Sequence, residues 1–145
     1  MSLLFAYGTL AIPEVMEAVT GQVFASREAT AHDFIRYLIR DRIYPGMTPA
    51  KGATASGQLY FGVGPATLKL LDEFEDEVYT RKLIPAQTQE GETFEAYSYI
   101  VTSEYRRILT SRPWCKDCFI ANHLPEYLTS CRAFYRDVFL RFRST

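Results

Sequence analysis

Five carboxylates surround one aromatic residue at positions 72–77 (DEFEDE), directly after an apolar stretch with helical spacing. Charge runs usually face water, which favours a solvated helix end. However, acidic side chains at the C-terminal end of a helix oppose its dipole, so one of them could be held inward for use. A carboxyl group beside Phe74 and nearby tyrosines would be partly desolvated. Its pKa would then rise toward the range useful for general acid–base catalysis.

A second candidate is the stretch FAYGTL, residues 5–10, where an apolar run ends in Tyr7-Gly8-Thr9-Leu10. A strand that ends at a glycine is either an ordinary turn or a place where backbone is offered to a ligand. Gly8 lacks a β-carbon, so a ligand could approach the main chain closely there. Spacing alone leaves both interpretations open.

Other familiar catalytic patterns are absent from the sequence. It contains no G-x-S-x-G nucleophile elbow, no P-loop and no G-x-G-x-x-G stretch. Its two histidines, His32 and His123, have no partner pattern that supports nucleophilic catalysis, and we expect His123 to be structural.

The three cysteines are Cys115, Cys118 and Cys131. With His123 they superficially resemble a zinc knuckle, but the spacing to Cys131 is wrong and the segment has helical periodicity, whereas a structural zinc ion needs four converging ligands. A thioredoxin-like redox role is disfavoured because no strand precedes the C-x-x-C pair. We therefore expect no metal, and we interpret the cysteines as small buried hydrophobic residues.

Composition limits the class of protein. The 145 residues are 48% hydrophobic and 23% charged, which is typical of a soluble globular protein, and we expect one domain over residues 1–145. A net charge of −1 without a basic stripe argues against nucleic-acid binding. We see no signal peptide and no apolar run long enough for a membrane span, and an odd number of cysteines makes no disulfide framework. These features predict a cytoplasmic protein with no membrane partner.

The hydrophobic pattern predicts an α+β fold. We expect strands at 3–7, 22–40 (one strand or two), 56–63, 78–89 and 93–101, the last two joined by a hairpin turn. Helices are expected at 12–20 and 65–74, and the C-terminal third should be helical, broken into two helices by Pro125. Residues 44–46 should break the chain and 47–55 should form a loop. Antiparallel hairpins should dominate a curved sheet or small barrel with flanking helices.

Four segments, in order along most of the chain, resemble the gamma-glutamylcyclotransferase-like superfamily. Residues 5–10 resemble its N-terminal YGTL signature, residues 44–46 its YP turn, and residues 56–60 its GxLY strand. Residues 71–81 (LDEFEDEVYTR) resemble its LDxFEgxxYxR block. The segment 114–135 is similar to the helical tail of the branch named for the plant avirulence-induced protein.

This resemblance implies a small barrel-like α/β fold with a cavity at one end, and a reaction. In enzymes of the family, the α-amine of a gamma-glutamyl group attacks its own gamma-carbonyl, releasing 5-oxoproline and an amine. The implied substrate is a small gamma-glutamyl amine, amino acid or acylated metabolite, and no covalent intermediate, metal or cofactor is required. Such a reaction needs a bent substrate, a carboxylate that shuttles a proton, and donors for the oxyanion.

Matching the motifs by position assigns the site. Glu75, which follows the aromatic residue of the block, would be the proton shuttle. The loop that grips the substrate with its backbone N–H groups would consist of Tyr7, Gly8, Thr9 and Leu10. Tyr79 would have a role in the pocket, and Arg81 would be a structural partner of Asp72. Many members have glycine where this chain has Asp76, and that added charge would raise the pKa of Glu75 if the two carboxyl groups face each other.

Three functions are compatible with the sequence. The first is a gamma-glutamyl cyclotransferase, and the second is a related acyl or aminoacyl transferase that uses the same pocket. The third is a non-catalytic module that binds a small molecule or has a regulatory role, because a fold does not dictate a function. We expect a monomer or a weak homodimer in each case.

Overall fold

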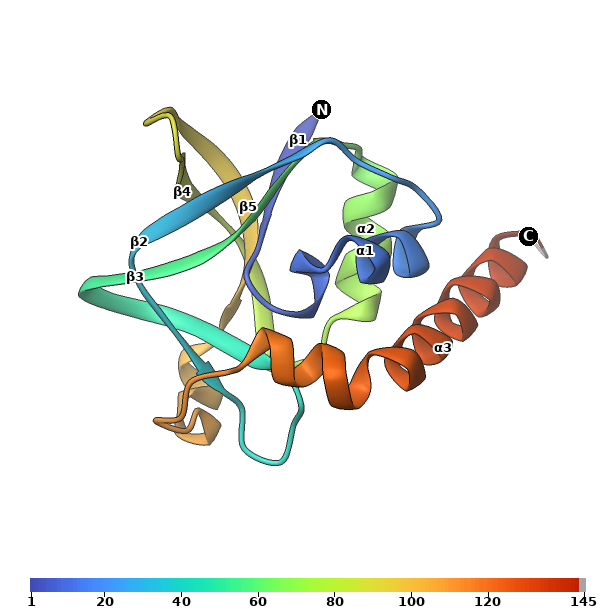
Figure 1. The fold of residues 1–145 in the computed structure, drawn as a ribbon. Coiled ribbons are helices and arrows are strands. Elements are labelled where there is room, and N and C mark those ends of the chain that lie inside the picture. Colours follow the sequence, from blue (N-terminus) through green and yellow to red (C-terminus); the bar gives the residue numbers. More distant parts are fainter. Residues whose placement is uncertain (144–145) are drawn as a thin grey trace.

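The computed structural model describes residues 1–143, in which five strands close into a barrel (Figure 1). The strands follow one another around the barrel in the order β1-β3-β2-β4-β5, mostly antiparallel, and a parallel pairing of β1 with β5 closes it. Their bounds are β1 (Ser2–Ala6), β2 (Ser26–Leu38), β3 (Pro45–Val63), β4 (Tyr79–Thr88) and β5 (Thr93–Val101). The fold is therefore α+β with a closed barrel-like sheet, as expected.

The α-helices gather on one side of the barrel (Figure 1). They are α1 (Pro13–Thr20), α2 (Pro65–Phe74) and α3 (Lys116–Arg143), with 3-10 helices η1 (Thr9–Ala11) and η2 (Ser103–Ile108). Within residues 1–143, no helix has both the length and the apolar character needed to cross a bilayer.

Proline and glycine set the bounds of the first two α-helices. Pro13 and Pro65 stand in the first turns of α1 and α2, where the missing N–H costs no hydrogen bond. Gly21 ends α1 with φ 71°, a left-handed conformation that glycine adopts without strain. Both helices and the β4–β5 hairpin lie where the sequence predicts them.

The prediction of a loop at residues 47–55 is wrong. These residues belong to β3, which starts at Pro45 and pairs with β2 along nearly its whole length. A register shift between His32 and Phe34 bends the ladder, and Asp33, with φ 65°, accepts a hydrogen bond of 2.8 Å from Gly52 N–H. This long-range pairing overrides the local loop-forming composition.

The prediction that Pro125 divides the C-terminal segment into two helices is also wrong. Pro125 lies inside the single helix α3. It lacks an N–H and crowds the preceding turn, which bends a helix without ending it when packing holds both halves. Figure 1 shows α3 changing direction along its length.

Two clusters of buried apolar side chains hold the fold together. One consists of strand residues such as Phe5, Met47 and Leu59, and fills the barrel. The other joins the outer face of the sheet to the helices, and includes Val15 of α1 and Phe119 of α3. Alternation along β1 sends successive side chains to different clusters, so the end of β1 lies where barrel and helices meet.

Candidate active site

A cavity of about 260 Å³ opens at the place where β1 ends. Its walls come from the end of β1 and η1, the start of β3, the C-terminal end of α2, the start of β4, β5 and α3. The residues that line it are Leu4, Phe5, Ala6, Tyr7, Gly8, Thr9, Leu10, Tyr44, Pro45, Phe74, Glu75, Asp76, Tyr79, Tyr99 and Tyr127. All six candidate site residues of the sequence analysis therefore lie around one cavity.

Glu75 lies at the end of α2, where the chain leaves the helix. Its N–H donates to Leu71 O at 3.0 Å, and its own backbone is extended, which turns the chain toward β4. The residue is half-buried at the cavity wall. Among the described side chains and backbone groups, none donates a hydrogen bond to its carboxyl group. That carboxyl is thus available to a molecule in the cavity.

The surroundings of Glu75 favour its protonated form. Burial, and then the charges of Asp76 and Asp72, raise the pKa of Glu75 to about 8. Asp76 keeps its charge, because the hydroxyl of Tyr44 donates to it at 2.6 Å and Arg42 at 3.2 Å. Burial opposes ionisation of Asp76, but these hydrogen bonds outweigh it and lower its pKa.

The acidic cluster divides into partnered carboxylates and one without a partner. Asp72 forms a two-pronged ion pair with Arg81, at 2.8 and 3.1 Å, and also accepts a hydrogen bond of 2.7 Å from Tyr99. The predicted pairing of Arg81 with Asp72 is confirmed. Glu73 points outward to Arg141 at 2.7 Å. The solvated-face interpretation therefore suits part of the cluster, while Glu75 turns to the cavity.

Residues 8–12 form a turn, and three of its residues, Gly8, Thr9 and Leu10, line the same cavity as Glu75. Its two closing bonds run from Ala11 N–H to Gly8 O and from Ile12 N–H to Thr9 O, each 3.0 Å long. The N–H groups before Ala11 belong to the first turn, where helical donors have no acceptor within the helix. Thr9 and Leu10 therefore bring N–H donors to the cavity wall.

Gly8 allows this turn to pack against Pro45. A β-carbon on Gly8 would lie 3.0 Å from both Cγ and Cδ of the Pro45 ring, which is tighter than ordinary contact. The ring is held in place, because Tyr79 donates its hydroxyl hydrogen to Pro45 O at 2.5 Å. A side chain at position 8 would therefore press on the Pro45 ring, which would have to shift.

The hydroxyl of Tyr7 is engaged by the barrel. It donates to Tyr99 O at 2.5 Å and accepts from Met47 N–H at 3.2 Å, which ties β1 to β5 and β3. The carbonyl of Tyr7 accepts a 2.6 Å hydrogen bond from Arg36. Tyr7 accordingly positions the loop, and its hydroxyl is not free to meet a ligand.

The family is decided by a comparison of sequence patterns. Residues 4–116 match the model of the family described as gamma-glutamyl cyclotransferase, AIG2-like. The chain belongs to this family.

Individual relatives agree with the family. The chain is similar to AIG2-like protein D of Arabidopsis thaliana, with 38% identity over 82 residues, covering 57% of this chain and 54% of the relative. It spans about half the length of the curated relatives it matches. A solved structure described as a gamma-glutamyl cyclotransferase shares the fold, with a TM-score of 0.64, 21% identity, and coverage of 91% of this chain and 86% of that chain.

A solved structure of an AIG2-like protein from Mus musculus is also similar. Its TM-score is 0.65 at 25% identity, with 80% of this chain and 86% of that chain covered. These likenesses confirm the barrel-like fold that the resemblance implies.

Three further tyrosines line the cavity and were not predicted as site residues, although one of them, Tyr44, belongs to the YP turn. They are Tyr44, Tyr99 and Tyr127. Tyr127 comes from α3, beyond the matched residues 4–116, and its hydroxyl lies 3.1 Å from Thr9 Oγ1. Ten tyrosines indicate partly polar walls, but tyrosines on an apolar helical stripe look like core residues.

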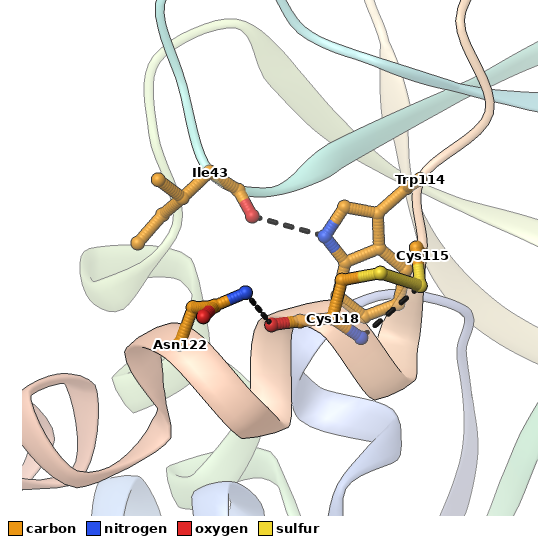
Figure 2. The surroundings of a disulfide bond; sticks show 5 residues. All are labelled: Ile43, Trp114, Cys115, Cys118 and Asn122. Atoms are coloured by element: carbon orange, nitrogen blue, oxygen red, sulfur yellow. Dashed lines mark hydrogen bonds between the residues drawn. A yellow bond between two sulfur atoms is a disulfide. The ribbon is translucent and has the colours of Figure 1, made fainter.

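The prediction for the cysteines needs correction. Cys115 and Cys118 are exposed and joined by a disulfide, so they are not two small buried hydrophobic residues (Figure 2). Cys131 alone fits that description, since it is buried in the cluster between sheet and helices. The same bond rules out Cys115 and Cys118 as a pair of zinc ligands in this state, and His123 packs its ring against Phe119.

Proposed function

We propose that this protein is a gamma-glutamyl cyclotransferase, which releases 5-oxoproline from a gamma-glutamyl amine, amino acid or acylated metabolite. The observation that carries the proposal is the position of Glu75. Glu75, whose carboxyl accepts no hydrogen bond from the described residues, lines the same cavity as residues 7–10, and its pKa is raised to about 8. A general acid–base group works best when its pKa lies near the working pH.

The reaction needs only one such group. The neutral form of the substrate α-amine attacks the gamma-carbonyl carbon and forms the ring C–N bond, and its nitrogen passes one proton to the Glu75 carboxylate. The tetrahedral intermediate then breaks its bond to the leaving amine, which takes the proton from Glu75. The products are 5-oxoproline and a free amine, and Glu75 returns to its starting state. The amine and the carbonyl belong to the same molecule, so a site that holds the substrate bent brings them into the geometry for attack.

The backbone N–H donors of the turn that lines the cavity suit the negative groups of such a substrate. No lysine or arginine is among the residues that line the cavity in the described part of the chain. A substrate carboxylate or a developing oxyanion must therefore rely on uncharged donors, such as the N–H groups of Thr9 and Leu10.

The test is a panel of gamma-glutamyl compounds with detection of released 5-oxoproline. We expect turnover of at least one compound, loss of at least about a hundredfold in kcat for Glu75→Gln, and little change for the control Glu73→Gln. Glu73 stands two residues before Glu75, in the last turn of α2, and pairs with Arg141; it does not line the cavity.

Two results would contradict the proposal. One is a complete absence of 5-oxoproline from the wild-type protein across the panel. The other is a turnover that Glu75→Gln leaves intact. Saturable binding of a panel member without turnover would favour the non-catalytic binding module.

A further inference from the structure

The disulfide between Cys115 and Cys118 lies at the start of α3 (Figure 2), and neither cysteine is among the residues that line the cavity. Cys115 immediately precedes the first helical residue, Lys116, and Cys118 stands in the first turn. Both cysteines are exposed to solvent, so a small molecule in solution can reach them.

The segment is held in place without the disulfide. Trp114 and Phe119 flank the pair and are buried, at 6% and 2% exposure, with ring centroids 5.8 Å apart. The indole N–H of Trp114 donates to Ile43 O at 2.9 Å, and Phe119 N–H donates to Cys115 O at 3.0 Å. A disulfide that closes so short a loop also constrains the unfolded chain least. Stability of the fold therefore does not account for this bond.

The helix gives the two sulfur atoms different surroundings. Cys118 N–H donates to Cys115 Sγ at 3.1 Å, and this N–H belongs to the open first turn of α3 (Figure 2). N–H groups at a helix N-terminus stabilise a thiolate, the reactive form of cysteine. Lys116 and Asp117 lie between the cysteines and carry opposite charges, so these two residues add no net charge beside the sulfur atoms. The Cys115 sulfur is accordingly the one whose thiolate form this N–H would stabilise after reduction.

We propose that Cys115 and Cys118 form a redox-active pair that exchanges with low-molecular-weight thiols, as a second site independent of the cyclotransferase cavity. Its basis is the placement of an exposed disulfide on the N-terminal turn of a helix whose position other contacts already secure. The C-x-x-C pair does not need a preceding strand for this chemistry, because the helix terminus and solvent access supply what the reaction requires.

Reduction of the disulfide consumes two external thiol molecules. One thiolate attacks Cys115 Sγ, forming a mixed disulfide while the bond to Cys118 breaks and Cys118 leaves as a thiolate that takes up a proton. A second thiolate attacks the external sulfur of the mixed disulfide, and Cys115 leaves. The pair gains two electrons and two protons, and two thiols become one external disulfide. In the reverse direction Cys115 attacks an external disulfide and Cys118 resolves the intermediate.

Cys131 is an internal control. It is buried at 1% exposure, and burial raises the pKa of its thiol to about 11. A thiol of that kind is a poor nucleophile at neutral pH. A chain without the pair, Cys115→Ser combined with Cys118→Ser, keeps Cys131 and reports the background reactivity.

The first experiment equilibrates the native, oxidised protein with buffers of reduced and oxidised glutathione and counts thiols by mass spectrometry after alkylation. We expect two thiols per chain to appear reversibly, with an unchanged circular dichroism spectrum and no modification of Cys131. The proposal is overturned if the disulfide is reduced only in denaturant, or if its reduction unfolds the protein.

The second experiment uses single variants to separate the two sulfur atoms. With glutathione disulfide at pH 7, Cys118→Ser should form a mixed disulfide at Cys115 about tenfold faster than Cys115→Ser forms one at Cys118, because thiolate content sets the rate. Both variants should release 5-oxoproline like the wild-type protein if the cyclotransferase proposal holds. Equal rates at the two cysteines, or rates no greater than that of Cys131, would refute the redox site and leave the cyclotransferase proposal untouched.

Discussion

The hydroxyl groups of Thr9 and Tyr127 lie 3.1 Å apart, although the two residues are 118 positions apart in the sequence. The contact joins η1 to α3, and both residues line the cavity. Phe74 extends this wall, with its ring edge-to-face against Tyr127 at 6.5 Å between centroids. The C-terminal helix is therefore a structural part of the candidate active site.

Replacement of Tyr127 by phenylalanine should weaken this link without opening a void. We expect a loss of about 0.5–1.5 kcal/mol in the free energy of unfolding, the usual net value of one hydrogen bond, measured by urea denaturation. Thr9→Ala, alone and combined with Tyr127→Phe, completes a double-mutant cycle. A coupling energy of zero would show that the two hydroxyl groups do not interact in solution.

The raised pKa of Glu75 should make stability depend on pH. The folded state holds this proton up to a pH of about 8, whereas the unfolded chain releases it near the ordinary value of 4.5. The stabilisation of the folded state by protonated Glu75 is therefore complete below pH 4.5 and is lost as the pH rises through about 8. Glu75→Gln removes the effect, so its stability relative to wild type should rise by on the order of 2–4 kcal/mol from pH 4 to pH 9.

The measurement is chemical denaturation of both proteins at several pH values between 4 and 9. Glu73→Gln is the matched control, because Glu73 faces Arg141 outside the cavity. A stability difference between wild type and Glu75→Gln that stays constant over this range would mean that Glu75 is ordinarily ionised in the folded protein.

Removing the neighbouring charge of Asp76 should shift the pH dependence of the proposed activity. Asp76→Asn keeps a side chain that can accept from Tyr44 but takes away one of the two charges that raise the pKa of Glu75. The rising limb of kcat/KM against pH should therefore move to lower pH, since Glu75 then ionises more readily. Glu73→Gln should leave the limb in place, and a shift of Asp76→Asn to higher pH would contradict the electrostatic account.

Gly8 and Thr9 should respond differently to substitution. Gly8→Val places branched carbon atoms against the fixed ring of Pro45, so we expect at least a tenfold loss of kcat/KM or a loss of about 1–3 kcal/mol in stability from overpacking. Thr9→Ser keeps the hydroxyl that meets Tyr127 and should be nearly neutral. Parallel kinetic and thermal-melting measurements test both. If Thr9→Ser abolished activity, the side chain and not the backbone of the turn would be essential.

Local sequence signals predict much of this fold. Pro13, Gly21 and Pro65 mark helix ends by their own backbone restrictions, and no distant contact has to be known to read them. The strand character of residues 47–55 depends on β2, which pairs with them, so their own composition misleads. The continuity of α3 through Pro125 likewise depends on the packing of both halves, which no local pattern records.

The candidate site divides in the same way. Glu75 and residues 7–10 lie in motifs, and the structure brings them to one cavity, while their chemical roles stay proposals. Sequence could not assign Tyr127 to that cavity, since its contact with Thr9 spans most of the chain. The sequence analysis missed the disulfide of Cys115 and Cys118 because it considered only whether all the cysteines pair to form a framework. Two cysteines three residues apart can pair with each other and leave a third one free.

The family match ends at residue 116, but the tightly packed part of the molecule does not. Phe119, Cys131 and Val138 of α3 are all buried, and α3 packs beside α1. A fragment that ends at residue 116 would expose the hydrophobic surface that α3 covers. We expect it to bind hydrophobic dyes and to aggregate. Anyone who trims this chain to its recognisable motifs should therefore keep the last helix.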